Sequence, residues 1–309
     1  MAKRKQTNTI PAYQKYTIVD FNAEFPTEDA CFMHILEARW PDGVAYCEKC
    51  ETERKHHRVT GRTAYACDRC GNHIYPLAGT IFEKTTTPLR IWFYAMYLMG
   101  STRCGVSAKQ IQRETGVTYK TAWRIFKQIR TLMSEDISLE GSAVEADESY
   151  FGGKAKNKRY GKRGGNGRSL DSKTPVFGMV ERGGRVVAMV TPDARAKTIL
   201  PIMHEHILPA TTVYTDDFPI YDKLSEHRNG YIHRRIQHTE KVYVMGDVHT
   251  NTIEGFWSLV KRGIGGVYHS VSRKYLQTYL DEYSFRYNRR NQGQAMFTSL
   301  LAEVSERAQ

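Results

Sequence analysis

Three acidic residues are the first candidates for chemistry in this sequence. Asp147 lies within the strand-like segment AVEADESYF, Asp216 ends the segment TTVYTD, and Glu254 falls early in the helical segment NTIEGFWSLVKR. Carboxylate oxygens are the ligands that hard Mg²⁺ prefers, and two ions bridging a phosphate can activate the attacking oxygen and stabilise the leaving one. A single acid is more often part of a surface ion pair, so the interpretation depends on the set. The three acids together predict divalent-metal phosphodiester chemistry.

Neighbouring acids offer alternatives at two of these positions. In a strand, side chains alternate between faces, so Glu145 and Asp147 share one face while Glu148 points to the other, and we prefer Asp147. Asp217 follows the end of its strand and can cap the next turn, which leaves Asp216 as the preferred ligand.

The predicted late helix carries a basic group on the same face as its acid. Asn251 and Glu254 are three residues apart, and Lys261 lies seven residues beyond Glu254. Residues at this spacing fall on roughly one helix face. A carboxylate and an ammonium group two turns apart can hold a metal ion and substrate DNA together.

Four of the six cysteines form two CxxC pairs, separated by residues 51 to 66. The pairs are Cys47 and Cys50 in CEKC, and Cys67 and Cys70 in CDRCG. Four thiolates at this spacing can close a tetrahedron around one Zn²⁺, and metal ligation supplies folding free energy to a segment with few apolar residues. Two redox pairs are the alternative. Cys31 and Cys104 lack such partners and are interpreted as small buried hydrophobic residues.

A helical region follows the cysteines. Apolar residues recur at helical spacing from Pro88 to Gly100, and the segment VSAKQIQRETGVTYKTAWRIFKQIRTLM then predicts two amphipathic helices separated by Gly116. This is helix-turn-helix spacing, and an ordinary helical hairpin is the alternative. In the first interpretation the second helix lies in a major groove and presents its basic groups to DNA. These groups are Lys120, Arg124 and Lys127.

From Ser142 the apolar period changes to two, which indicates a sheet. Strands are expected at AVEADESYF, at TPVFGMV and RVVAMVT around a Gly-Gly turn, and at TTVYTDD. Helices are expected at 194–207, 251–262 and 272–287. The order predicts a mixed α/β (α+β) fold with an early hairpin and late helices.

Residues 152–173 contain eight Lys or Arg and too few apolar groups to fold alone. We expect a mobile basic loop that contacts a nucleic-acid backbone, with a solvated linker as the alternative. The residues expected to touch DNA are Lys154, Lys156, Lys158, Arg159, Lys162 and Arg163.

The whole chain has 309 residues and a formal net charge of +12, which favours a polyanionic partner. Its longest apolar stretch, Ile91 to Met99, is much shorter than the roughly 20 residues that cross a bilayer. We therefore expect no membrane association and a cytoplasmic, nucleoid-associated location. The cysteine pattern also fits a reducing compartment better than a secreted one.

At these residues the chain resembles the DDE transposases of prokaryotic insertion sequences, in the zinc-ribbon group related to Merlin elements. The resemblance rests on four segments and spans about residues 20 to 290. The segments are CEKC with CDRCG, VEADESYFGGK, YTDDFPIYDKL and HTNTIEGFWSLVKRGIGGVYHSVS.

This resemblance implies an RNase H-like catalytic fold, a Mg²⁺ (or Mn²⁺) site at Asp147, Asp216 and Glu254, and transfer of element ends into target DNA. It makes Lys261 the basic residue that follows the last acid. Asn251 is an alternative third ligand, although an anionic oxygen binds Mg²⁺ more strongly than an amide. The expected partners are double-stranded DNA, as terminal repeats and target, and a second copy of the chain in a dimer assembled on DNA.

The expected organisation has five parts. They are a basic arm at 1–25, a zinc ribbon at 26–82, a helix-turn-helix-like region at 83–137, the catalytic domain at 138–295 and a C-terminal tail at 296–309. Two other functions compete with transposition. A zinc-ribbon transcriptional regulator would have no reason to gather three carboxylates, whereas a metal-dependent nuclease without joining activity uses the same chemistry.

Overall fold

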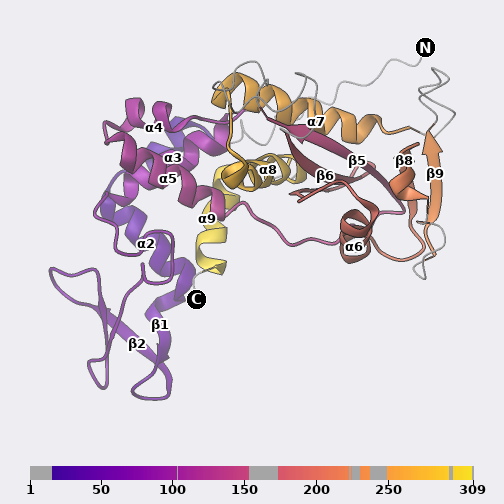
Figure 1. Cartoon of the computed structure of the whole chain (residues 1–309). Coiled ribbons are helices and arrows are strands. Elements are labelled where there is room, and N and C mark those ends of the chain that lie inside the picture. The colour runs from indigo at the N-terminus through magenta and orange to yellow at the C-terminus, as the bar shows by residue number, and fades with distance from the viewer. Residues whose placement is uncertain are drawn as a thin grey trace, which may run out of the picture. The chain divides into compact units, whose positions relative to one another are not determined.

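A computed structural model describes residues 16–102, 104–152, 173–222, 224, 230–236, 249–291 and 295–307. The chain divides into two compact units, one formed by Met1–Leu132 with Asn291–Gln309 and the other by Met133–Arg290 (Figure 1). None of the helices in the described ranges is long and apolar enough to cross a membrane.

The first unit contains a four-stranded antiparallel sheet that carries the cysteine pairs. Two short helices precede it, α1 (Ile18–Glu24) and α2 (Glu28–Arg39). The strand order is β1-β2-β3-β4. The strands are β1 (Val44–Cys47), β2 (Thr52–Arg58), β3 (Tyr65–Cys67) and β4 (His73–Ile74).

Among its described residues, the first unit also contains four further helices. They are α3 (Leu89–Ser101), α4 (Ala108–Thr115), α5 (Tyr119–Thr131) and α9 (Met296–Glu306). Gly116 ends α4 with a φ of 71°, the left-handed conformation that glycine adopts without a steric penalty. The predicted helices and the glycine turn between them are confirmed. The apolar stripe of α5 is buried as expected, and Ile125 and Ile129 are fully inaccessible.

Two segments at the ends of the chain differ from the expected arm and tail. Residues 18–24, which were expected in the arm, form α1 and bury Phe21 completely. Residues 296–306, which were expected in the tail, form α9 and pack against α2 and α3. The packing is close, because a Cβ on Gly100 would lie 2.9 Å from the backbone nitrogen of Phe297. Apolar residues at helical spacing explain both helices.

The second unit is built on a five-stranded mixed sheet in the order β7-β6-β5-β8-β9. Strands β5, β6 and β7 are antiparallel neighbours, whereas β8 runs parallel to β5 and β9 runs parallel to β8. The strands are β5 (Ala143–Phe151), β6 (Thr174–Glu181), β7 (Val186–Val190), β8 (Thr212–Asp216) and β9 (Ile232–Ile236). The mixed α/β prediction is confirmed, and β9 is a strand that the sequence analysis did not predict.

Helices cover both faces of this sheet. On one face α6 (Ala196–His206) closes a core that includes Val144, Ala146 and Val213. On the other face α7 (Asn251–Gly263) and α8 (Arg273–Asn288) close a second core with Phe151. Figure 1 shows α6 and α7 on opposite sides of β5 and β6. All eight residues of β6 are buried, as expected for a strand covered on both faces.

A glycine allows α7 to lie directly on the sheet. Gly178 of β6 pairs with Asp147 of β5. A Cβ at position 178 would lie 2.4 Å from Cζ2 of Trp257 and 3.2 Å from Cδ1 of Ile253, both in α7. No side chain larger than hydrogen fits there unless the helix moves away from Asp147.

Gly178→Ala should therefore lower the free energy of unfolding of the second unit by about 1–3 kcal/mol, because the added methyl group overpacks the interface between helix and sheet. Urea denaturation measures the change. Gly255→Ala is the matched control, because a Cβ at this α7 position meets nothing within 4 Å. Alanine has the higher helix propensity, so the control should be stabilised by up to about 1 kcal/mol. Equal stability of the two variants would contradict the close-packing argument.

Candidate active site

The strand pattern brings two of the predicted acids to one face of the sheet. Val144 and Ala146 face α6, so the alternate residues Glu145 and Asp147 face α7. Strand β8 is in parallel register with β5. Val213 of β8 also faces α6, which places Asp216 on the α7 side with Asp147.

The third acid, Glu254, lies in the first turn of α7. Burial, the charge of Asp216 and the charge of Glu254 together raise the pKa of Asp147 from 3.8 to about 6. Asp216 and Glu254 therefore lie close enough to Asp147 for their charges to affect its ionisation. The indole of Trp257 also lies near Asp147 and opposes this shift in its pKa, although its Nε1 makes no hydrogen bond of good geometry.

Each of the other two acids has a local hydrogen-bond donor. The backbone N–H of Phe218 donates to Oδ1 of Asp216 at 3.1 Å, and the hydroxyl of Thr250 donates to Oε1 of Glu254 at 3.2 Å. Asp216 therefore caps the turn after β8 itself, a role that the sequence analysis allowed for Asp217. Asp217 is exposed.

The remaining residues predicted on α7 are exposed. Asn251 is the first residue of the helix, and Lys261 is in its last turn. Lys261 lines a cavity of about 220 Å³ together with Tyr150 and His269. This cavity lies at the end of β5, which is the strand that carries Asp147.

Glu148 is a fourth carboxylate near the acids, which the sequence analysis set aside because it faces the other way. It does lie on the α6 face, where the hydroxyl of buried Tyr221 donates to it. Burial raises the pKa of Glu148 to about 7, and the charges of Asp147 and Asp216 add to the shift. Alternation identified its face, but the sequence held no indication of the tyrosine partner.

The acidic site fits divalent cations by its chemistry. Its donors are carboxylate oxygens, and burial, with the nearby charges of Asp216 and Glu254, raises the pKa of Asp147. The ligand oxygens of Asp147, Asp216 and Glu254 do not all lie within 4.8 Å of one another. Within the described part of the chain, the cysteines are the only group of three or more candidate ligands whose atoms all lie within 4.8 Å of one another.

The four predicted zinc ligands converge in the first unit. The Sγ atoms of Cys47 and Cys70 are 3.5 Å apart, and those of Cys50 and Cys67 are 3.9 Å apart. Four sulfurs at about 2.3 Å from a tetrahedral zinc ion would be separated by roughly 3.8 Å. The clustering expected for a metal-binding ribbon is confirmed.

The thiol groups of the cluster perturb one another's ionisation. Hydrogen bonding with the thiol of Cys70, together with desolvation, raises the pKa of Cys50 to about 12, whereas the backbone N–H groups of Cys70 and Arg69 lower the pKa of Cys67 to about 7. A divalent ion would compensate several thiolates at once. Of the other two cysteines, Cys31 is buried as expected, but Cys104 is exposed and its predicted burial is wrong.

The predicted DNA-contacting residues fall into two groups. Lys120, Arg124 and Lys127 are exposed along α5, on the side away from its buried stripe. The six basic residues expected to touch DNA in the loop lie outside the described residues. They are Lys154, Lys156, Lys158, Arg159, Lys162 and Arg163.

One unit contains a four-cysteine ribbon, and the other has two acids on one face of a mixed sheet and a third on the helix that covers this face. These features define a two-part protein with two candidate metal centres. Residues 138–288 match an ISXO2-like transposase domain, and residues 26–73 match a transposase zinc-ribbon domain. The chain belongs to this family of insertion-sequence transposases, which confirms the resemblance found in the sequence.

Two relatives illustrate the family. A protein in transposable element ISH50 of Halobacterium salinarum is 32% identical over 269 residues, which are 82% of this chain and 88% of the relative. A transposase-like protein of Haemophilus influenzae is 31% identical over 104 residues, which are 34% of this chain and 81% of the relative.

Elemental analysis should find one zinc per chain in the purified protein, because a tetrahedral thiolate site requires all four cysteines for full affinity. The double variant Cys67→Ser, Cys70→Ser should lose that zinc. Cys104→Ser is the control, because Cys104 is exposed and outside the cluster, so it should retain the metal. Equal zinc content in the double variant and the wild type would count against the ribbon site.

The acidic site should reduce the stability of the second unit when no divalent ion is added. The pKa of Asp147 is about 6 in the folded protein, and the ordinary value for an aspartate, which applies to the unfolded chain, is 3.8. The unfolded chain therefore binds fewer protons between these values, and stability falls as the pH rises through this window. Asp147→Asn removes that charge and should be more stable than the wild type at pH ~7.5 by about 1–3 kcal/mol.

Chemical denaturation at two pH values tests this expectation. The excess stability of Asp147→Asn should shrink at pH ~5, where the wild-type carboxyl is mostly protonated. Added Mg²⁺ should stabilise the wild type and leave the variant unchanged. Asp217→Asn is the control, because its side chain is exposed. An Asp147→Asn protein that is less stable than the wild type at both pH values would contradict the predicted charge crowding.

Proposed function

We propose that this transposase cleaves phosphodiester bonds at the ends of its insertion sequence and joins those ends to target DNA, using Mg²⁺ or Mn²⁺ held by Asp147, Asp216 and Glu254. The observation that carries the proposal is that Asp147 and Asp216 lie on the α7 face of the sheet and Glu254 lies in the first turn of α7, with burial and the charges of the other two acids raising the pKa of Asp147 to about 6. A chain of net charge +12 gains nothing in DNA affinity from such a cluster.

The three acids reach the metal site from three different elements in this proposal. Asp147 and Asp216 extend from adjacent parallel strands and hold cations against the sheet. Glu254 approaches the same space from α7 and completes the set. The ions, when bound, activate the attacking oxygen and stabilise the leaving oxygen of the phosphodiester. Lys261, two turns further along α7, contacts a phosphate of the bound strand.

DNA binding is assigned to the basic groups outside the acidic site. The zinc ribbon and the exposed basic side of α5 contact the element ends, and the basic loop at 152–173 contacts the backbone. Together these contacts position the duplex, since phosphate contacts set register and orientation. The reaction runs on a dimer assembled on DNA, in the nucleoid. A mixed five-stranded sheet flanked by helices supports an RNase H-like assignment for the catalytic domain.

Asp147→Asn and Asp216→Asn should each abolish cleavage and joining while element-end binding stays within about twofold of the wild type, because binding depends on cations elsewhere. A strand-transfer assay with labelled element ends and a parallel binding assay measure the two activities. Asp217→Asn is the matched control, because it removes the same charge from the adjacent exposed residue and should remain active.

A second comparison assigns the third ligand. If Glu254 holds metal, Glu254→Gln abolishes joining and Asn251→Ala has a mild effect, whereas the reverse result assigns the position to Asn251. Full strand transfer by Asp147→Asn in Mg²⁺ would overturn the metal mechanism. Cleavage by the wild type without any joined product would favour a hydrolytic nuclease.

A further inference from the structure

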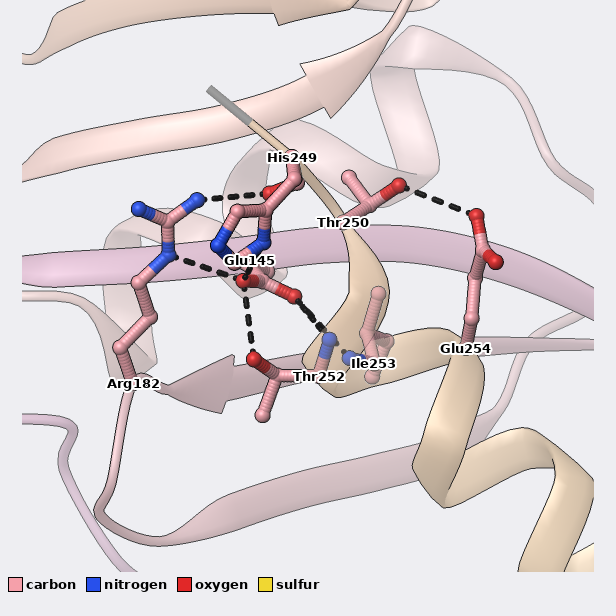
Figure 2. A network of polar contacts seen from close by, with 7 residues as sticks. All are labelled: Glu145, Arg182, His249, Thr250, Thr252, Ile253 and Glu254. Atoms are coloured by element: carbon pink, nitrogen blue, oxygen red, sulfur yellow. Dashed lines mark hydrogen bonds and ion pairs between the residues drawn. The ribbon is translucent and has the colours of Figure 1, made fainter. Parts of the chain in front are cut away.

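A fully buried carboxylate, Glu145, lies beside the acidic site and takes no part in the mechanism above. Its exposed fraction is 0%. It accepts hydrogen bonds from the backbone N–H of Thr252 at 2.8 Å, from the backbone N–H of Ile253 at 3.0 Å and from the hydroxyl of Thr252 at 2.9 Å. All three donors belong to the first turn of α7, as Figure 2 shows.

These contacts make Glu145 the cap of a helix that does not cap itself. The first N–H groups of a helix have no partner within the helix, and the preceding residue commonly supplies one. Thr250 holds that position before α7, but its side chain makes no capping bond and donates instead to Glu254. The cap therefore comes from β5, and the partial positive charge of the helix N-terminus stabilises the buried carboxylate.

Arg182, from the turn between β6 and β7, completes the network. Its Nε donates to Oε1 of Glu145 at 2.8 Å, and its Nη2 donates to the backbone carbonyl of His249 at 2.7 Å. Its guanidinium carbon lies 3.7 Å from the centre of the Tyr214 ring in β8. Nδ1 of His249 lies 3.2 Å from Oε1 of Glu145 but without hydrogen-bond geometry.

The network joins the three elements that carry the three acids. In β5, Glu145 is two residues before Asp147. In β8, Tyr214 is two residues before Asp216, and it pairs with Glu145 in the strand register. In α7, Thr252 is two residues before Glu254. Three contacts join these elements: Glu145 with Thr252, Glu145 with Arg182, and Arg182 with the Tyr214 ring. We expect the loss of any one of them to shift an acid relative to the other two.

We propose that Glu145, held by Arg182, is a positioning residue that fixes the separation of Asp147, Asp216 and Glu254 and so sets the affinity of the site for divalent metal. This inference rests on the proposed function, because it assigns a purpose to that spacing. Mg²⁺ demands near-ideal octahedral geometry, so a small displacement of one acid weakens its binding. Residues that orient metal ligands typically change affinity or activity by about 10–100-fold when they are replaced.

The second unit offers a matched control. Glu181 is a buried carboxylate at the end of β6, and it accepts from the backbone N–H groups of Glu140, Gly141 and Arg185. Like Glu145 it is almost inaccessible and satisfies three donors, but those donors lie in loops that carry none of the three acids. Glu145→Gln and Glu181→Gln thus remove the same charge from similar surroundings.

Two measurements that need no catalysis test the proposal in the full-length protein. Hydrogen exchange should show the amides of Thr252 and Ile253 exchanging about tenfold faster in Glu145→Gln than in Glu181→Gln, because the weaker cap lets the first turn of α7 open more often. Titration with Mn²⁺, followed by electron paramagnetic resonance of the free ion, should show about 10–100-fold weaker binding in Glu145→Gln and wild-type affinity in Glu181→Gln. The Mg²⁺ concentration for half-maximal cleavage should rise in the same order.

A milder pair of variants keeps the test valid if Glu145→Gln fails to fold. Thr252→Val has nearly the same shape as threonine but loses the hydroxyl bond to Glu145, whereas Thr252→Ser retains it. Thr252→Val should weaken Mn²⁺ binding several-fold, whereas Thr252→Ser, which keeps the hydroxyl, should bind Mn²⁺ as tightly as the wild type. Unchanged Mn²⁺ affinity in Glu145→Gln, with or without faster exchange, would overturn the positioning role and leave Glu145 as a helix cap alone.

Failure of the proposed function has a different signature. If Asp147→Asn binds Mn²⁺ as the wild type does, the acids do not hold the ion, and both the metal site and its positioning by Glu145 are overturned. If the wild type binds Mn²⁺ through Asp147 but cleaves no element end, only the proposed reaction fails. In that case the contrast between Glu145→Gln and Glu181→Gln in Mn²⁺ affinity still decides the inference.

Discussion

The contact between α7 and the sheet is the constraint on which the catalytic unit depends. The helix supplies the third acid, so it must come close to the strand that supplies the first, and Gly178 leaves room for Trp257 and Ile253 at that point. The same contact buries the α7 side of the sheet. The interface between α7 and the sheet therefore sets both the packing and the geometry of the site. The apolar side of α7 holds the helix in a position from which its first turn can reach Asp147 and Asp216.

Both candidate metal centres concentrate anionic or ionisable ligands at a cost in electrostatic free energy. In the second unit burial, with the charges of Asp216 and Glu254, raises the pKa of Asp147, and in the ribbon hydrogen bonding with the thiol of Cys70 raises the pKa of Cys50. Like charges held close together resist ionisation unless a cation compensates them. In the second unit, the burial of the apolar cores on both faces of the sheet offsets this electrostatic cost.

Periodicity in the sequence predicted the elements that carry the chemistry. Strands β5, β6, β7 and β8, helix α7 and the cysteine spacing all follow from local pattern, because each has a clear apolar period or a metal-ligand motif. Strand β9 was missed, since its HRR segment is polar and lies at the sheet edge. The roles of Glu145 and Arg182 were missed for another reason. Alternation assigns a face to a residue, but only tertiary structure shows which backbone groups lie opposite it.

The positions of Glu145 and of the proposed metal-binding acids follow from the geometry of strands and helices. On a strand, residues two apart share a face, so the buried Glu145, which holds the first turn of α7, lies on the same face as Asp147. On a helix, residues two apart point in different directions, but the free N–H groups of the first turn point along the axis. Anchoring α7 through its backbone amides therefore leaves the side chain of Glu254 free to face the acids. A strand carboxylate that bound a side chain further along α7 would need that side chain on the helix face that packs against the sheet. Apolar residues of α7 already occupy that face.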